Sequence, residues 1–375
     1  MDRIKKILIV GGGIGGLASA IALRKAGMEV ELIEISKTLT AYHIGIVVQA
    51  NFIRAAQALG IADRIVAAGY PYNGLNFQDI HGKLLQRLPG HHMAGEKYST
   101  HLGMARPALH KVLSEAALEA GTRVRTGITF ESIKQDQDQV HVRFTDGSSG
   151  SYDLVVGADG VYSAVRKALF GDLYKPEFTG QGVWRYNVPR PKDLTSSFVA
   201  MGLEKGKCGF IPLSEETGYV WLVQEELGNP RYAQEDLADI FRERLAPCTG
   251  VLAWFREHIT DASQVVYRPL EALLVPAPWY EGRVLLIGDA AHATTPHMGQ
   301  GSAQAVEDAV VLAELFSIDQ PVEASMAQFM ERRYERCKFI VESSLQIGEW
   351  EQRPTLDADA PGLTARMLDV MAQPI

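Results

Sequence analysis

A carboxylate follows an apolar strand in the stretch Arg283 to Gly301, which reads RVLLIGDAAHATTPHMGQG. Val284 to Ile287 have the character of a buried strand, and Asp289 stands directly after the glycine that ends it. A carboxylate at a strand tip can accept hydrogen bonds from ligand hydroxyl groups, and a glycine-rich continuation lets the backbone approach that ligand closely. The pattern suits a ligand site, and a plain strand-turn-helix connection is the structural alternative.

A second glycine-rich stretch, GGGIGG at residues 11–16, fits the spacing G-x-G-x-x-G. It follows a predicted strand, Lys6 to Val10, and opens a predicted helix, Gly15 to Ala26. Glycines there let backbone N–H groups approach a pyrophosphate at the positive helix end, and let helix and strand pack closely. Glu34 closes the next strand about 20 residues on, where an acid can accept hydrogen bonds from ribose hydroxyls. This context predicts dinucleotide binding, and the motif alone does not separate FAD from NAD.

A third block, DLVVGADGVYSAVR, spans Asp153 to Arg166 and places another glycine-acid pair after a short apolar strand. In order and separation the three blocks resemble those of single-component, FAD-dependent aromatic hydroxylases of the para-hydroxybenzoate and salicylate hydroxylase type. The resemblance covers most of the chain in architecture and is tight in the three blocks. It implies a flavoprotein with FAD as the bound cofactor and NADH or NADPH as the co-substrate.

The resemblance also implies which residues hold FAD. The first block and its acid hold the ADP half, residues 157–160 lie near the pyrophosphate and NAD(P)H, and Asp289 accepts a hydrogen bond from the ribityl chain. Arg106 matches a family arginine that contacts FAD, with a helix-start arginine paired to an acid as the structural alternative; for Asp159 the alternative is a turn residue. The helix beginning near Ser302 aims its positive end at the flavin pyrimidine ring. The predicted cofactor-binding residues are Gly11, Gly13, Ile14, Gly15, Gly16, Glu34, Ile35, Arg106, Asp159, Gly160, Gly288, Asp289, Pro296, Gly299, Gly301 and Ser302.

The chemistry that the resemblance implies is oxygen insertion into an aromatic ring. NAD(P)H reduces the flavin, O2 adds to form a hydroperoxide at flavin carbon 4a, and the distal oxygen transfers to an electron-rich ring. The cofactor supplies this reaction, so the protein supplies placement, a dry pocket and proton handling. Activation of a phenol or amine asks for a general base or a hydrogen-bond relay near the ring.

Candidates for the substrate site lie mainly on a predicted sheet between residues 177 and 274. Strand alternation places Phe210 and Pro212 on one face, and Tyr219, Trp221 and Val223 together on another, so that Tyr219 and Trp221 share a wall of the predicted pocket. Family positions add Lys207 and His297. Ordinary core packing is the alternative for a strand Tyr or Trp. The predicted catalytic residues are Tyr219, His297, Pro296 and Lys207, and the predicted substrate contacts are Phe210, Tyr219, Trp221 and His297.

Two further patterns bear on the site. His292 and His297 lack the spacing of a helical zinc pair and have no evident third ligand, so no metal is expected. Residues 37–49 read KTLTAYHIGIVVQ, where the family usually has an arginine and Gly-x-Gly-Ile. Gly45 is kept, but His43 stands where the first glycine is expected, and this departure concerns FAD anchoring or the route of flavin movement.

Composition excludes several function classes. The 375 residues are 46% hydrophobic and 22% charged, ordinary values for a globular chain of two domains or one large discontinuous one. A net charge of -8 offers no footprint for nucleic acid or an anionic membrane surface. The three cysteines, Cys208, Cys248 and Cys337, lack CxxC spacing, which fits a reducing compartment, so the cytoplasm is predicted. The run Ile7 to Leu23 imitates a secretory signal, but its five glycines disfavour the helix that a signal or membrane span needs.

The patterns along the chain predict an α/β fold: a Rossmann-like FAD-binding domain of the para-hydroxybenzoate hydroxylase type, with an inserted, mostly antiparallel β-sheet substrate domain and C-terminal helices. Helical patterns fall at 51–58, 107–120, 234–245, 301–316 and 322–347, and a hairpin at 128–153. The predicted FAD-binding domain comprises residues 1–70, 98–175 and 276–348, and the substrate domain comprises 71–97 and 176–275. Residues 349–375 are predicted as a C-terminal tail that covers the active site or lies at a dimer contact.

We therefore predict an FAD-dependent monooxygenase that uses NAD(P)H and O2 to hydroxylate a small aromatic or N-heteroaromatic substrate, with decarboxylation where oxygen enters at a carboxylated carbon. Hydroxybenzoates, salicylate and hydroxypyridines are the substrate types. The alternatives are an epoxidase, halogenase or reductase of the same fold, or a non-catalytic FAD-binding redox sensor. The sequence leaves open the substrate, the position of oxygen insertion, NADH or NADPH, monomer or homodimer, and the residue that activates the substrate.

Overall fold

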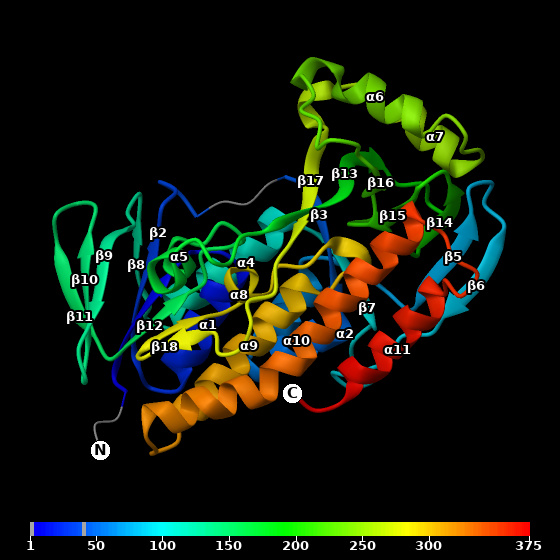
Figure 1. Ribbon diagram of the computed structural model, residues 1–375. Coiled ribbons are helices and arrows are strands. Elements are labelled where there is room, and N and C mark those ends of the chain that lie inside the picture. The colour runs from blue at the N-terminus through cyan, green and yellow to red at the C-terminus, as the bar shows by residue number, and fades with distance from the viewer. Residues whose placement is uncertain (1–3, 40–42) are drawn as a thin grey trace.

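The computed structural model describes residues 4–39 and 43–375 (Figure 1). Residues 1–3, which precede the signal-like run, and residues 40–42, within the segment that departs from the family pattern, lie outside the described residues. The described chain has two main sheets, two three-stranded sheets and helices, which confirms the predicted α/β class.

The first main sheet has the strand order β18-β19-β12-β1-β2-β8 and is parallel except for β18. Its strands are β1 (Lys6–Val10), β2 (Glu29–Glu34), β8 (Arg123–Thr126), β12 (Leu154–Gly157), β18 (Tyr280–Glu281) and β19 (Val284–Leu286). The strand β1 reads KILIV, and Ile7 to Val10 are all buried, as expected where helices cover both faces of a parallel sheet. Helix α1 (Ile14–Lys25) packs along α9 (Gly301–Phe316) and α4 (Arg106–Glu119). The two ends of the chain thus share one layer.

The second main sheet has the order β17-β13-β16-β15-β14-β5-β6 and is antiparallel except between β14 and β5. Its strands are β5 (Leu75–Asp79), β6 (Leu84–Leu88), β13 (Glu177–Pro189), β14 (Phe198–Leu203), β15 (Gly206–Pro212), β16 (Thr217–Glu225) and β17 (Val266–Ala272). Residues 75–88 and 177–272 therefore share one sheet, as the proposed division into domains requires, and the exact boundaries stay a prediction. Helices α6 (Leu237–Arg244) and α7 (Val251–His258), at the top of Figure 1, pack against one face of this sheet.

The remaining elements connect these layers. The three-stranded sheets are β9 (Phe130–Gln135), β10 (Val140–Phe144) and β11 (Ser149–Tyr152), and β3 (Gly45–Gln49), β4 (Tyr70–Tyr72) and β7 (His101–Ala105). The other helices are α2 (Ala50–Ala58), α3 (Ala62–Ala67), α5 (Ala164–Phe170), α8 (Asp289–His292), α10 (Val322–Gln352) and α11 (Ala360–Ala372), with the 3-10 turns η1 (Gln234–Asp236), η2 (Ala262–Gln264) and η3 (Pro296–Met298).

The C-terminal region differs from a tail. Helix α10 was expected to end near Ile347 but continues to Gln352, and α11 follows after seven residues. Pro361 stands in the first turn of α11, where proline is tolerated, and the Asp359 side chain accepts a hydrogen bond from the Gly362 N–H. A second difference is α7, a helix that the sequence did not predict, held by its buried Leu252 and Phe255.

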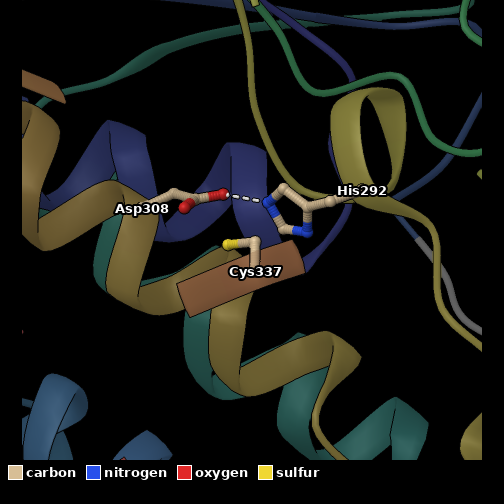
Figure 2. A group of neighbouring side chains, drawn as sticks. All are labelled: His292, Asp308 and Cys337. Carbon is tan, nitrogen blue, oxygen red and sulfur yellow. Dashed lines mark hydrogen bonds and ion pairs between the residues drawn. The ribbon is translucent and has the colours of Figure 1, made fainter. Parts of the chain in front are cut away.

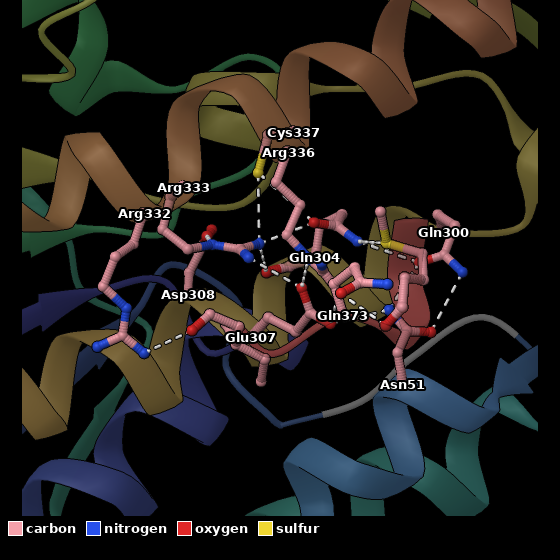
Figure 3. A network of polar contacts seen from close by, with 12 residues as sticks. Asn51, Gln300, Gln304, Glu307, Asp308, Arg332, Arg333, Arg336, Cys337 and Gln373 are labelled. Carbon is pink, nitrogen blue, oxygen red and sulfur yellow. Dashed lines mark hydrogen bonds and ion pairs between the residues drawn. The ribbon is translucent and has the colours of Figure 1, made fainter. Parts of the chain in front are cut away.

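A buried network of charges joins α10 to α9 (Figure 3), and through Asp308 it reaches the glycine that follows β19. The fully buried Arg333 of α10 donates from Nε to Asp308 Oδ1 at 2.7 Å and from a terminal nitrogen to Glu307 Oε2 at 2.8 Å. Asp308 Oδ2 accepts the Gly288 N–H at 2.9 Å and contacts His292 Nε2 at 2.7 Å. Burial would raise the pKa of Asp308, but His292 and Arg333 lower it to about 2. Asp308 therefore stays ionised and fixes the tip of β19.

Replacing the central carboxylate should be costly. Asp308→Asn should lower the free energy of unfolding by about 3–5 kcal/mol, because it leaves the buried Arg333 without half of its counter-charge. Chemical denaturation measures the change. Glu314→Gln is the control, since it removes an exposed partner of Arg332 at 2.8 Å and should cost less than about 1 kcal/mol. Equal losses for the two variants would contradict the assigned role.

Candidate active site

A cavity of about 760 Å³ is lined by residues of both main sheets. The N-terminal part of the chain contributes Gly12–Gly15 and Glu34, and the C-terminal part contributes residues 287–289 and 293–302. The antiparallel sheet contributes one of its faces, and α11 contributes Ala360, Thr364, Met367 and Leu368. Segments far apart in the sequence therefore meet around one space, and part of the predicted tail covers it.

The glycines at residues 11–16 are required for different steric reasons at different positions. A Cβ on Gly16 would lie 1.9 Å from the Gly11 carbonyl oxygen, so this position must be glycine for strand and helix to approach. A Cβ on Gly11 would lie 2.4 Å from the Ala158 carbonyl oxygen, and the Gly11 φ is +110°. A Cβ on Gly13 would meet nothing within 4 Å. Gly13 faces the cavity at the N-terminus of α1, where N–H groups suit a pyrophosphate.

Glu34 lies at the end of β2 and lines the cavity. Its carboxylate accepts the Gly12 N–H at 2.7 Å and the Ser36 N–H at 2.8 Å, which holds it beside the glycine turn. Ile35 is 71% exposed and does not line the cavity, so its side chain is not placed to contact a cofactor there. Strand alternation turns it away from the side on which Glu34 lies.

Asp159 has the turn role rather than the predicted FAD contact. Its carboxylate accepts the N–H groups of Ala164 and Val165 at 2.7 and 3.0 Å and the hydroxyl of Ser163, so it caps α5. Asp159 does not line the cavity, whereas the neighbouring Gly160 does. The stretch Asp153 to Arg166 therefore reaches the cavity through the backbone of Gly160, and its Asp159 carboxylate stabilises the N-terminus of α5.

Asp289 and Arg106 both line the cavity. Within residues 4–39 and 43–375, the Asp289 carboxylate has no ion-pair or hydrogen-bond partner, and Arg106 Nε has no hydrogen-bond partner. Asp289 begins α8 after Gly288, whose φ is +56°. Its side chain is open to the cavity, but the cavity lies inside the protein, so burial raises the pKa of the carboxyl, while His292 and Arg106 oppose the rise. Both groups fit a ligand rich in hydroxyl groups and phosphate, and with the open space at Gly13 they fit FAD.

The loop after α8 connects this region to the antiparallel sheet. A Cβ on Gly301 would lie 4.0 Å from Asp289 Oδ1, and Gly299, with φ +63°, packs against Gln49. Pro296, Gly299, Gly301 and Ser302 line the cavity, as predicted for a loop beside the reactive ring of FAD. The loop therefore runs from the Asp289 side of the cavity to His297, which contacts groups from α10.

Five residues of the antiparallel sheet form what we call the sheet wall: Arg185, Lys207, Tyr219, Trp221 and Val223. In the register of the sheet, Trp221 is opposite Arg185 and Gly209, and Val223 is opposite Lys207. A Cβ on Gly209 would lie 2.5 Å from the Trp221 ring, and one on Gly45 would lie 2.3 Å from the Tyr219 ring. Gly209 on the neighbouring strand β15 and Gly45 on β3 of another sheet thus make room for the two aromatic rings. The sequence missed Arg185, although alternation with Val183 would have placed it on this face.

The predicted substrate contact Phe210 is on the other face. Its ring stacks on Phe255 of α7 with centroids 4.8 Å apart, it packs near Phe198, and it does not line the cavity. The reason is the two-residue period of a strand, because Phe210 is an odd number of positions from Lys207, which faces the cavity. Phe210 belongs to the core beneath α6 and α7.

A buried carboxylate beside the sheet wall also comes from the stretch predicted as a tail. Glu351, near the end of α10, contacts Lys207 Nζ at 2.7 Å and His297 Nε2 at 3.2 Å. The contact between Lys207 Nζ and Glu351 Oε1 is an ion pair whose geometry does not meet the angular criteria of a hydrogen bond. Burial would raise the pKa of Glu351, but Lys207 and His297 lower it to about 2. The helical period from Ser344 through Gly348 was the signal that could have placed Glu351 on a buried face.

A second polar group could suggest a metal. His292, Asp308 and Cys337 bring one ligand atom each to within 4.8 Å of one another (Figure 2). Both Asp308 oxygens already have partners, and the Arg333 guanidinium contacts the Cys337 sulfur at 3.3 Å. A metal cation would face this buried guanidinium. We therefore assign the group to the buried charge network.

Comparison with known proteins shows which family the chain belongs to. The model of the FAD binding domain family matches residues 5–328. The chain is 33% identical over 378 residues to 2-heptyl-3-hydroxy-4(1H)-quinolone synthase of Pseudomonas aeruginosa, with 96% of each chain covered. It is 31% identical over 356 residues to aurachin C monooxygenase/isomerase of Stigmatella aurantiaca, covering 92% of this chain and 90% of that protein. The structure of Klebsiella pneumoniae HpxO complexed with FAD and uric acid has a TM-score of 0.86 at 24% identity, covering 98% of this chain and 96% of the other.

The fold and the glycine-acid elements around the cavity define an FAD-binding oxidoreductase. The chain belongs to the FAD binding domain family, among the FAD-dependent monooxygenases of the aromatic hydroxylase type. The predicted family, fold class and cofactor FAD are thereby confirmed. None of the helices in the described ranges has the length and apolar character needed to cross a bilayer. Cytoplasmic location and oligomeric state stay predictions.

Gly13 and Gly16 allow a matched test of cofactor binding. Gly13→Ala should leave the unfolding temperature of the apoprotein unchanged, because the methyl group enters open space, but should weaken FAD binding at least about tenfold by occupying that space. Gly16→Ala should destabilise the apoprotein itself, since its Cβ collides with backbone. Flavin fluorescence titration and thermal unfolding separate the two effects. Unchanged FAD affinity in Gly13→Ala would contradict this placement.

Proposed function

We propose that the enzyme uses NADH or NADPH and O2 to hydroxylate a small aromatic or N-heteroaromatic ring that carries an acidic group. The observation that carries the proposal is the shared cavity, in which the FAD-binding groups and the sheet wall face one space. The loop with Pro296 and Gly299 lies between them. A ring held against the sheet wall is therefore next to the loop predicted to hold the reactive end of FAD.

The chain's own residues supply placement and shielding. FAD, when bound, supplies the activation of oxygen. Tyr219 and Trp221 offer flat apolar surfaces for a ring, and burial raises the pKa of Tyr219, which keeps its phenol neutral. Met367 and Leu368 of α11 close the cavity with apolar surface, which limits the entry of water.

Arg185 supports an acidic substrate. It lies in the sheet wall, and no carboxylate partner for its guanidinium is present among residues 4–39 and 43–375. Burial and the neighbouring cations Arg106 and Arg268 lower its pKa to about 10, so Arg185 still carries a charge at neutral pH. A substrate carboxylate or ring oxyanion would relieve the repulsion among these cations, and a guanidinium can bind a carboxylate through two parallel hydrogen bonds.

The name of one relative supports the ring class. 2-Heptyl-3-hydroxy-4(1H)-quinolone synthase is named for a hydroxylated quinolone, which is an N-heteroaromatic ring. A nitrogen ring bearing an ionisable oxygen would suit both the flat aromatic surfaces and the cations of the sheet wall. We therefore include hydroxyquinolones beside hydroxybenzoates and hydroxypyridines.

Turnover tests the proposal directly. The FAD-loaded protein should consume NADH or NADPH faster in the presence of one of these acidic rings, and 18O2 should place one labelled oxygen atom in the product. Stopped-flow absorbance follows flavin reduction, and mass spectrometry follows the product. If no ring accelerates reduction or gains oxygen, the monooxygenase proposal fails, although FAD binding would stand.

Arg185→Met tests the recognition of the acid. The variant should bind hydroxybenzoates about 10- to 100-fold more weakly, because a charge-assisted hydrogen bond to the carboxylate is lost. Binding of the matching hydroxybenzamides, which have the same ring without the charge, should change less than about threefold. Perturbation of the flavin absorbance spectrum gives both dissociation constants. Equal losses for acid and amide would show that Arg185 does not recognise the charge.

A further inference from the structure

Three side chains from separate elements meet at one side of the sheet wall. Lys207 of β15 and His297 of the loop after α8 both line the cavity. Glu351 of α10 contacts both of them but does not line the cavity, so it lies behind them. All three side chains are at least nine-tenths buried. A substrate in the cavity can therefore reach Lys207 and His297 but not Glu351.

The two members of this group that line the cavity, Lys207 and His297, are not equally free to bind. Both ring nitrogens of His297 have partners, Nδ1 with Thr295 Oγ1 at 2.7 Å and Nε2 with Glu351 at 3.2 Å. Burial and Lys207 lower the pKa of His297, so the imidazole is neutral near pH 7. Lys207 has three N–H donors, and Glu351 is its partner among the described residues. The ammonium thus has donors left that face the cavity.

The same wall holds a donor without a partner among the described residues, the indole N–H of Trp221. The buried Trp221 Nε1 has no hydrogen-bond partner in the described structure. Trp221 is the diagonal neighbour of Lys207 across β15 and β16, a relation in which Cα atoms are roughly 7–8 Å apart and long side chains can reach one group. Buried donors without partners are costly, so this part of the cavity is built for an acceptor.

We propose that Lys207 binds the ionised oxygen of a hydroxylated ring, and that Glu351 is a positioning residue that holds Lys207 and His297 for this purpose. The proposal rests on the proposed function and names the chemical class of its substrate as a phenolate or the equivalent oxyanion of an N-heteroaromatic ring. The ring binds as the anion, and its proton stays in solvent. No side chain of the site has to accept that proton, which agrees with the occupied nitrogens of His297.

An ionised ring oxygen serves the reaction because it enriches the ring in electrons at the carbon that receives oxygen. In a water-poor cavity such an anion needs a cation and N–H donors, and Lys207 supplies both. Glu351 prevents the ammonium from folding back onto other acceptors and orients its free donors toward the cavity. Gly348 allows this arrangement, since a Cβ there would lie 3.2 Å from His297 Cε1 and 2.7 Å from Gln181 Oε1.

The test uses 4-nitrophenol as a probe, because its absorbance spectrum distinguishes phenol from phenolate. In the FAD-loaded parent protein the bound probe should ionise at a pH at least one unit below that of the free probe. Lys207→Met should abolish this shift and weaken binding of the phenolate roughly 10- to 100-fold. Lys207→Arg should restore most of the shift, since it restores a cation with N–H donors.

A double-mutant cycle tests whether Glu351 acts through Lys207. Glu351→Gln should weaken phenolate binding, and the variant carrying both Glu351→Gln and Lys207→Met should bind no more weakly than Lys207→Met alone. Lys205→Met is the matched control, since it breaks an exposed Lys–Glu pair of 2.6 Å on the same hairpin and should leave probe ionisation as in the parent. FAD content and unfolding temperature are measured for every variant.

Three results would overturn the inference. They are an unshifted probe in the parent protein, an unchanged probe spectrum in Lys207→Met, and additive effects of the two substitutions. Additive effects with lowered stability would identify Glu351 as an ion-pair partner that only anchors α10. If the parent hydroxylates an aromatic ring while any of these results holds, the proposed function stands and the role of Lys207 falls.

Discussion

The structure depends on one buried carboxylate, that of Asp308. It holds the Gly288 amide, the His292 imidazole and the Arg333 guanidinium, which belong to a strand tip, a short helix and the long helix α10. A buried charge must be paired and hydrogen-bonded, so the three elements cannot separate without leaving a charge unsatisfied. Asp289 is presented to the cavity by the backbone that Asp308 fixes. The cofactor site is therefore supported by an ion pair, Asp308 with Arg333, that does not itself line the cavity.

The same network extends to the wall of the active site. Glu307, beside Asp308, binds Arg54, Arg333 and Arg336, and the arginines from α2 and α10 donate to carbonyl groups at the end of α11 (Figure 3). Cations at a helix C-terminus are favourable because they meet its negative end. Helix α11 thereby becomes a fixed part of the cavity rather than a loose tail, and the substrate site and the FAD site share their support.

Several parts of the site followed from the sequence because their signals are local. The glycine motif at residues 11–16 and the loop from Pro296 to Gly301 are short, continuous stretches in which backbone geometry dictates the residue type. Glu34 and Asp289 each stand at or just after the end of a strand, which can be recognised from the neighbouring residues. Tyr219 and Trp221 followed from strand alternation. Asp159 and Phe210 were assigned to the site but serve α5 and the core beneath α7, because neither a motif nor a strand states which neighbour a side chain meets.

The sequence by itself determined the FAD-binding family, the α/β class and the presence of a mostly antiparallel sheet, since these rest on motifs and on short-range periodicity. The tertiary structure alone decided that Glu351 stands behind Lys207 and His297 and that α11 closes the cavity. Glu351 is 144 positions from Lys207, and their contact depends on how a helix crosses a sheet. A contact between such distant residues leaves no pattern in the local sequence. Lys207 and Glu351 meet because the packing of α10 on the sheet buries both charges together.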